Sequence, residues 1–494
     1  MDNPLVKINP MTKRLVTFPV LMSGLFIFLM MAFGVIMLLN QANMIQINMG
    51  MFYQLMTIHG TGMIGFAALG AAGIMWYFLS QYVELNRRVF QINLILFLLG
   101  VVSVLVGIFK YDFAGGWTFL YPLPAMSGGM WAEAGATLYL GGMLLIGCGF
   151  LLLFLEVSRA IISKYGSFAQ SLGWPHIFGL RKEEDAPPPT VVASTMVSIV
   201  NITALIAGAA ILVMSLINLY NPSFTIDPLL AKNLIYAFGH IFANSIIYMG
   251  VILVYEMLPR YTGRPWKSYK IFLIAWTLST IFTIIIYPHH LLMDFVMPNW
   301  MLIIGQVLSY MNGLPVLIVT AYGALMIVYR SGIKWDVTSS FIMLSMFGWV
   351  IGVIPAIIDA TIIVNQVMHN TQWVPGHFHL YMGIGATAMI IGFMFYLTKF
   401  DANRTDQEID RASFWSFIIG ILGLSASFLY SGQISTPRRW AEHVPEWIAP
   451  NIIGVIFGTI ATLAMLVFVF RFIVISHKIG KSETSFDEST RKIS

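Results

Sequence analysis

Residues 373–382 read WVPGHFHLYM and begin an apolar run that continues to about residue 398, long enough to cross a bilayer as a helix. The stretch places His377 and His379 two positions apart. Two helical steps rotate a side chain by about 200°, so the two imidazoles leave the helix on opposite sides. Taken alone, the pair is also compatible with two histidines at an interfacial helix end. On a spanning helix, however, it predicts that one helix serves two separate sites.

Composition restricts the class of protein. The 494 residues are 58% hydrophobic and 10% charged, with a mean hydropathy of +0.80, far outside the range of a soluble globular domain. We therefore predict an all-α membrane protein with many spans. Its single cysteine, Cys148, excludes an intrachain disulfide and a thiolate cluster, so a bound metal must use nitrogen or oxygen ligands.

Apolar runs of spanning length predict twelve transmembrane helices. They cover residues 15–39, 56–80, 89–109, 135–157, 191–219, 232–257, 269–289, 301–329, 339–364, 374–399, 412–430 and 449–474. Lys7, Lys13 and Arg14 precede the first run, which lacks a small-residue cleavage site. We expect this end to be a first span and not a removable signal.

The basic residues predict the orientation, because they gather on the cytoplasmic face of membrane proteins. If the N-terminus is cytoplasmic, that face collects nearly all of the 27 Lys and Arg residues. The exceptions are Lys110, Lys232, Arg438 and Arg439. Both termini are then cytoplasmic, and the net charge of +5 needs no nucleic-acid partner. Residues 1–494 are expected to form one membrane domain, with 158–190 as a charged, proline-rich cytoplasmic linker.

Six of the ten histidines then fall in the outer third of the membrane, on four helices. They are His59, His240, His289, His290, His377 and His379. Ionisable or metal-binding side chains inside a bilayer are costly unless they are partnered, so they are candidates for function. Imidazole without thiolate suits iron or copper.

The tenth-span pair requires two metal centres, one on each side of its helix. His289 and His290 differ by about 100° and would not converge on a regular helix, but Pro288 and the helix end allow a distortion. Together with His240 they can form a three-histidine site. His59 is then left to meet one member of the tenth-span pair.

With these residues the sequence resembles subunit I of the heme-copper oxidase superfamily over nearly the whole chain. The matching segments are YQLMTIHG (53–60), GGWTFLYPLP (115–124), GHIFAN (239–244), PHH (288–290), VMHNTQWVPGHFHL (367–380) and PRR (437–439). The segment 367–380 is similar to the B-type branch in particular. The fold implied is the twelve-helix subunit I fold.

The resemblance implies two hemes. His59 and His379 would be the axial ligands of a low-spin heme, and His377 would be the proximal ligand of a high-spin heme. Arg438 and Arg439 match the pair that meets the heme propionates, and two cations suit those carboxylates.

The resemblance also implies a metal that faces the high-spin heme, copper at a CuB-like site in preference to non-heme iron. Its ligands would be His240, His289 and His290. Asn244 departs from the pattern, because A-type and B-type oxygen reductases carry there a tyrosine that is cross-linked to a copper histidine and can supply an electron and a proton. Tyr236 and Tyr248 on the same helix are not placed to replace it. The C-type position for this tyrosine is Thr283, and Tyr287 is a weaker substitute.

The cytoplasmic proton route of the B-type branch is also incomplete. It uses tyrosines on the sixth helix and Ser/Thr after a proline in the eighth. The matching positions here are Val251, Tyr255, Val316 and Val319, so most hydroxyls are missing. His369 and Asp359 near the outer face are candidates for a proton route, with a solvated interfacial role as the alternative.

These departures favour NO over O2 as substrate. Reduction of O2 takes four electrons at once and benefits from the tyrosine, whereas coupling of two NO molecules takes two electrons. NO reductases of this superfamily lack the tyrosine, and the superfamily includes a branch with asparagine at this position that is assigned to NO reduction. Asn244 is neutral and can hydrogen-bond bound NO through its amide. We therefore expect the catalytic subunit of a respiratory nitric oxide reductase.

The expected setting is the cell membrane, with the active site toward the outer face. A companion subunit with a cupredoxin-type copper centre or a c-type heme would deliver electrons from cytochrome c or a similar donor. One alternative is a terminal oxygen reductase that uses Tyr287. Another is a secondary transporter, which fits the span count but leaves the six histidines unexplained.

Overall fold

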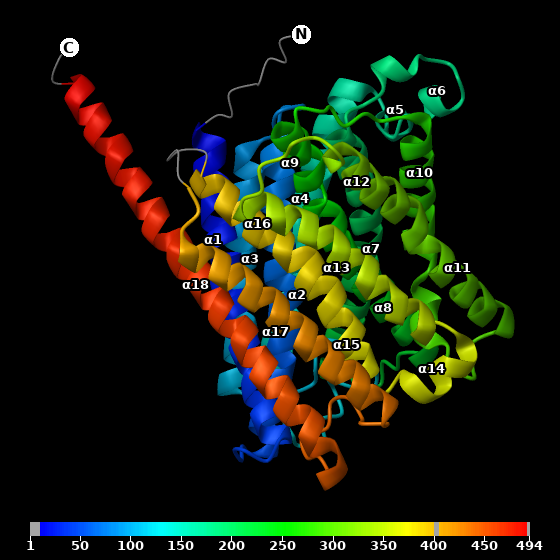
Figure 1. Cartoon of the computed structure of the whole chain (residues 1–494). Helices are drawn as coiled ribbons and strands as arrows, with labels where there is room; N and C mark the ends of the chain where they lie inside the picture. The colour runs from blue at the N-terminus through cyan, green and yellow to red at the C-terminus, as the bar shows by residue number, and fades with distance from the viewer. Residues whose placement is uncertain (1–9, 400–404, 492–494) are drawn as a thin grey trace.

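The computed structural model describes residues 10–399 and 405–491, and the elements in these ranges are all helices (Figure 1). Twelve of the helical stretches are long and apolar enough to cross a membrane, so the prediction of an all-α protein with twelve spans is confirmed. Lys7 and the two chain ends that we expect to be cytoplasmic lie outside the described residues.

Eight spans contain one helix each. They are α1 (Pro10–Gln41), α2 (Met49–Leu79), α3 (Arg87–Lys110), α4 (Glu133–Tyr165), α7 (Pro189–Tyr220), α13 (Val337–Asp359), α17 (Glu408–Gln433) and α18 (Pro445–Arg491). Four spans are interrupted. They are α8 with α9 (Pro228–Gly250, Ile252–Thr262), α10 with η2 (Lys270–Ile285, Tyr287–Leu291), α11 with η3 and α12 (Asn299–Leu317, Ile318–Tyr322, Gly323–Val328), and α15 with η4 and α16 (Trp373–Phe378, His379–Thr387, Ala388–Lys399).

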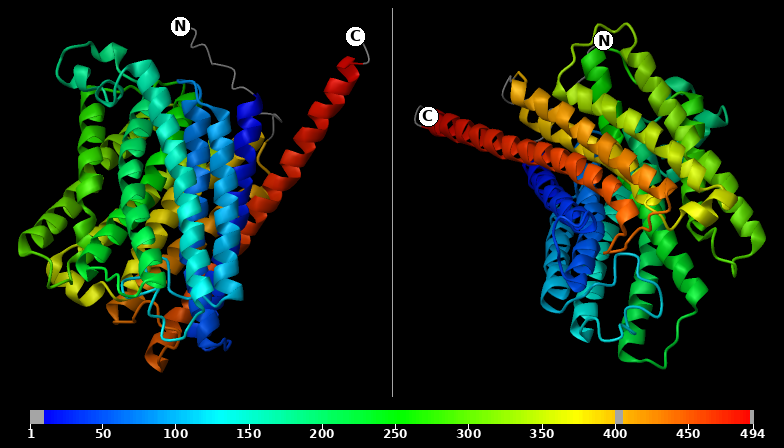
Figure 2. Two further views of the ribbon diagram at one scale, coloured as in Figure 1. Left: turned by 180° about the vertical axis from the view of Figure 1, so that it is seen from behind. Right: turned by 60° about the horizontal axis from the view of Figure 1, so that its bottom comes forward.

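Three spans form the centre of the bundle. The most apolar stretch is 83% buried in α2, 78% in the α8–α9 span and 89% in the α15–η4–α16 span, against 29–50% in the other nine. The views in Figure 2 show the remaining spans arranged around them, with α18 running obliquely across one side. The central spans therefore carry four of the six predicted site histidines, and η2, which lies beside α8, carries the other two.

The interruptions and ends differ from the predicted runs at several points. Helix α2 begins at Met49, seven residues early, because the Asn48 side chain accepts from the Met51 N–H and caps the helix. His59 therefore lies inside the span and does not start it. The linker predicted at 158–190 is shorter, since α4 continues to Tyr165 and α7 begins at Pro189. The connection contains three short helices, α5 (Phe168–Ser171), α6 (Trp174–Ile177) and η1 (Glu183–Asp185).

The tenth span is not one regular helix. Its middle part, η4, is a π-helix that begins at His379, and π-helical turns are frequent at functional sites. Gly348 and Gly352 of α13 let this wider segment approach closely, because a Cβ on Gly352 would lie 2.8 Å from the backbone N and Cα of Tyr381. Helix α13 thus fixes the position of the backbone that follows the two histidines.

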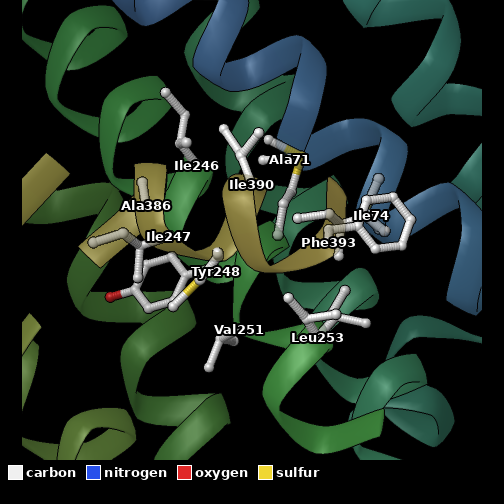
Figure 3. Packing of buried hydrophobic residues seen from close by; sticks show 14 of the residues in the cluster. Ala71, Ile74, Ile246, Ile247, Tyr248, Val251, Leu253, Ala386, Ile390 and Phe393 are labelled. Carbon is white, nitrogen blue, oxygen red and sulfur yellow. The ribbon is translucent and has the colours of Figure 1, made fainter. Parts of the chain in front are cut away.

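An apolar layer closes the central spans on the side away from the histidines. Figure 3 shows side chains of α2, α8, α9, η4 and α16 in contact, among them Ala71, Ile74, Ile246, Ile247, Val251, Leu253, Ile390 and Phe393. All of these are buried. The layer separates the histidine-bearing end from the opposite end of the bundle.

The loop of residues 434–444 is anchored at the histidine end of the bundle. Asn40 and Gln41 at the end of α1 donate to the carbonyls of Ala441 and Trp440, at 2.8 and 2.6 Å. The side-chain amide nitrogen of Asn451 in α18 lies 2.7 Å from Nδ1 of His443. The loop that carries Arg438 and Arg439 is therefore held by the first and last spans.

A substitution at Gly352 tests the contact between α13 and η4. Gly352→Ala should cost about 1–3 kcal/mol, because the added methyl group meets backbone that cannot rotate away. Gly141→Ala is the matched control, since a Cβ there has no atom within 4 Å and alanine is the better helix former. Thermal unfolding of the two purified variants checks the expectation, and equal stability would contradict it.

The pH dependence of stability tests the anchoring of the loop. Burial lowers the pKa of His443 to about 4, and the hydrogen bond from Asn451 opposes this shift only partly. As pH falls from about 6.5 toward 4, the unfolded chain binds a proton at this position that the folded protein does not bind, so stability should decrease. His443→Gln, which keeps an acceptor for Asn451, should lose less stability over this interval. Melting temperatures that fall equally with pH in both proteins would contradict this role of His443.

Candidate heme and metal sites

His59 of α2 and His379 of η4 face each other across a gap. Their ring centroids are 6.3 Å apart and their planes differ by 19°. Nδ1 of His59 donates to the carbonyl of Met30 at 2.6 Å, and Nδ1 of His379 donates to the carbonyl of Pro375 at 2.7 Å. Each Nε2 therefore keeps its lone pair free. Two metal–imidazole bonds of ~2 Å would place the two nitrogens ~4 Å apart, and a centroid separation of 6.3 Å leaves room for this. The gap therefore fits one heme iron that both imidazoles would bind.

His240, His289 and His290 converge on a second point. Nδ1 of His240 lies 2.9 Å from Nε2 of His290 and 3.1 Å from Nε2 of His289. Nδ1 of His289 donates to the Ser309 hydroxyl at 2.7 Å, because that hydroxyl itself donates to the carbonyl of Gly305. The three nitrogens form a metal-ligand cluster. Three imidazole nitrogens without thiolate suit copper or iron.

The 3-10 segment η2 makes this convergence possible. Helix α10 ends at Ile285, and Pro288 lies in the following turn, as expected for a residue that cannot continue the hydrogen-bond ladder. The Tyr287 hydroxyl donates to Asn233 at 3.1 Å, and Lys232 pairs with Asp294 at 2.6 Å. These contacts tie η2 and the loop after it to the start of α8, so the predicted distortion is present.

One cavity joins both sites. Its volume is about 520 Å³, and all six histidines line it. His377 enters it from the tenth span, and its Nδ1 atom is buried with no hydrogen-bond partner among the residues that the structure describes. The imidazole nitrogens that line the cavity suit heme iron and a further metal.

Asn244 and Tyr381 form a polar pair beside the three-histidine cluster. The amide nitrogen of Asn244 lies 2.6 Å from Nε2 of His240, and the Tyr381 hydroxyl donates to Oδ1 of Asn244 at 2.8 Å. Both side chains line the cavity. Tyr381 was missed in the sequence because only tyrosines near His240 and His290 were considered. Its spacing of four residues from His377 was the available signal.

Arg438 and Arg439 also line the cavity. Burial and the neighbouring Arg439 lower the pKa of Arg438 to about 10, so the guanidinium remains charged at neutral pH. Arg439 donates to the Thr118 hydroxyl at 3.0 Å and has a φ of 67°, a backbone conformation that costs free energy and that surrounding contacts must hold. Two cations that line the cavity suit propionate groups.

Some of the residues considered for a proton route make polar contacts, and others are apolar and buried. The Tyr255 hydroxyl lies 2.6 Å from that of Thr320, a residue that the sequence comparison passed over in favour of Val319. Val251 and Val316 are fully buried apolar residues. At the other side of the site, Nδ1 of His369 lies 3.6 Å from a carboxylate oxygen of Asp359, and both residues are buried.

The chain is similar in sequence and in fold to known proteins. The family model described as "Cytochrome C and Quinol oxidase polypeptide I" matches residues 14–460. "Cytochrome c oxidase subunit 1" of Thermus thermophilus is 24% identical over 270 residues, which are 50% of this chain and 48% of that protein. "Heme-copper oxidase subunit I+III" of Aeropyrum pernix is 20% identical over 440 residues, 85% of this chain and 51% of that protein.

The fold comparison agrees. A chain from a cryo-EM structure of a heme-copper terminal oxidase dimer superposes with a TM-score of 0.76 at 19% identity, covering 94% of this chain and 83% of that one. The present chain spans about half the length of the curated relatives it matches. On the extent of the family match, this chain belongs to the cytochrome c and quinol oxidase polypeptide I family, the heme-copper oxidoreductases whose subunit I binds hemes and copper.

Proposed function

We propose that this chain is the catalytic subunit of a nitric oxide reductase, which converts two NO, two protons and two electrons to N2O and water. The observation that carries the proposal is Asn244, whose amide lies 2.6 Å from Nε2 of His240. A neutral amide in that place can hydrogen-bond a small ligand but cannot supply an electron. Coupling of two NO molecules takes two electrons, so it does not need an electron from this residue.

The residues take the following roles in this proposal. His59 and His379 hold a low-spin heme and His377 holds a high-spin heme. His240, His289 and His290 hold copper. Bound heme iron and copper would together supply the two electrons and the binding positions for NO. Arg438 and Arg439 bind heme propionates, and Asn244 orients the substrate.

One contact favours oxygen reduction as a second candidate. The Tyr381 hydroxyl lies 2.8 Å from Asn244, so a phenol is present at the site after all. The Tyr287 hydroxyl, which the sequence suggested for this role, instead bonds Asn233. Tyr381 is separated from His240 by the asparagine, which places it one hydrogen bond further from the metal ligands than a cross-linked tyrosine would be.

The distribution of basic residues and the apolar composition support the proposed setting. The protein would lie in the cell membrane as one domain with both ends and the 166–188 connection in the cytoplasm, and the cavity would open toward the outer face. Electrons would arrive from a companion subunit with a cupredoxin-type copper centre or a c-type heme, fed by cytochrome c or a similar donor. The relatives named cytochrome c oxidase support a donor of this class.

Turnover with the two substrates tests the function. Purified, reduced enzyme should form N2O rapidly from NO under anaerobic conditions, and the same preparation should take up oxygen slowly. The reason is that two electrons suffice for NO coupling whereas O2 cleavage gains from a phenol bonded to the metal ligands. Fast oxygen uptake with little N2O would identify an oxygen reductase, and the search for its electron donor would begin at Tyr381.

The substitution Asn244→Tyr tests the residue that carries the proposal. It should lower N2O formation by roughly tenfold, the scale of one lost hydrogen bond to the substrate, while the heme and copper contents stay at wild-type values. Metal analysis and heme spectra of the variant provide the control. Full NO turnover by Asn244→Tyr would remove Asn244 from the reaction.

A further inference from the structure

Two helices that supply metal or heme ligands each present a polar side chain one turn further along. Asn244 follows His240 by four residues on α8, and Tyr381 follows His377 by four residues on the tenth span. The two side chains bond each other at 2.8 Å. A hydrogen-bonded line therefore runs from Nε2 of His240 through the Asn244 amide to the Tyr381 hydroxyl.

The direction of each hydrogen bond in this line is set by the proton on His240. An asparagine nitrogen can only donate, so in the observed arrangement Nε2 of His240 accepts from it at 2.6 Å. A neutral imidazole carries one proton, which must then be on Nδ1. The Tyr381 hydroxyl uses its hydrogen to reach Oδ1 of Asn244 and has none left for another partner.

A metal on Nδ1 of His240 reverses this arrangement. Nδ1 is the atom that faces His289 and His290, so it is the atom that would bind the metal, and the imidazole proton must then be on Nε2. Two donors cannot face each other at 2.6 Å. The amide must turn over, so that Oδ1 accepts from Nε2–H and the amide nitrogen donates to the oxygen of Tyr381.

We propose that the Asn244–Tyr381 pair couples metal binding at His240 to the release of the Tyr381 hydroxyl hydrogen, which then donates to a small ligand in the cavity. The ligand class is a diatomic molecule or its reduced, oxygen-bearing product. The inference rests on the proposed metal ligation by His240, and it holds for either NO or O2 as substrate. Tyr381 would then determine how strongly the site binds a ligand that accepts a hydrogen bond.

The surroundings of Tyr381 suit a fixed donor. Its backbone lies against Gly352 of α13, where a Cβ would approach within 2.8 Å, and the π-helix η4 begins two residues before it. Backbone held this closely leaves the ring few alternative positions. A hydroxyl group carried by such a backbone can change its hydrogen-bond partner without a movement of the helix.

Carbon monoxide bound to the reduced holoenzyme provides the test, read by infrared spectroscopy in H2O and D2O. The C–O stretch of the wild type should shift on exchange of the solvent, because an exchangeable O–H group donates to the ligand. Tyr381→Phe should abolish this shift and lower turnover by roughly tenfold. Tyr248→Phe is the matched control on the same cavity and should keep the shift.

Asn244→Leu tests the coupling itself in copper-depleted protein. The wild type should then show no D2O shift, because the Tyr381 hydroxyl donates to Asn244, whereas Asn244→Leu should show it because that acceptor is gone. Equal spectra of the two copper-depleted proteins would contradict the coupling. If Tyr381→Phe fails to fold, protein that is isotope-labelled at Tyr381 alone suffices, since the chain has 20 tyrosines. Without ligand, its phenolic C–O band should move from a donor to an acceptor position when copper-depleted protein is loaded with copper.

The outcomes distinguish a failure of the Asn244–Tyr381 proposal from a failure of the proposed nitric oxide reductase function. A full D2O shift in Tyr381→Phe with wild-type copper content would overturn the proposal, as would an unchanged tyrosine band on copper loading. Protein that binds no copper would also overturn it, because the premise at His240 would be absent. Fast oxygen uptake with little N2O would refute the nitric oxide reductase and leave the result for Tyr381 intact.

Discussion

Every imidazole nitrogen inside an apolar helix bundle needs a hydrogen-bond partner or a metal, because an unpaired buried polar atom costs free energy. The structure satisfies one nitrogen of His59 with a carbonyl of α1, one of His379 with its own helix, and one of His289 with a hydroxyl of α11. The second nitrogens are left to converge in the cavity. These bonds bring segments of the first, second, seventh, eighth and tenth spans together at one site.

Irregular helical segments allow the imidazole nitrogens to converge although the rest of each span is regular. A 3-10 segment brings two adjacent histidines to one point, and a π-helix starts at the histidine that pairs with His59. Each irregular segment is supported from outside, η2 by Lys232 with Asp294 and η4 by the glycines of α13. Unusual backbone therefore persists where neighbouring contacts hold it, as expected for strained functional segments.

The sequence predicted what depends on composition and on residue identity, namely twelve spans, a group of three histidines and the meeting of His59 with a histidine of the tenth span. It could not predict what depends on packing across the bundle. Met49 starts α2 because of the Asn48 cap, a signal easily overlooked beside a long apolar run. The contact of Tyr381 with Asn244 becomes visible only when the tenth span is placed against α8, and that of Thr320 with Tyr255 only when the eighth span is placed against α9. Roles at the metals stay predictions, since they depend on the groups that bind there.

The π-helix also affects how this chain can vary in length. A π-helical turn closes its hydrogen bond one residue further along than an α-helical turn, so it holds one residue more. Loss of one residue between 379 and 387 can therefore be absorbed by a return to α-helical turns, and the buried face of α16, which carries Ile390 and Phe393, would stay toward the centre of the bundle. Related sequences that are one residue shorter here are expected to keep α16 in place and to differ in the wider turn that follows His379.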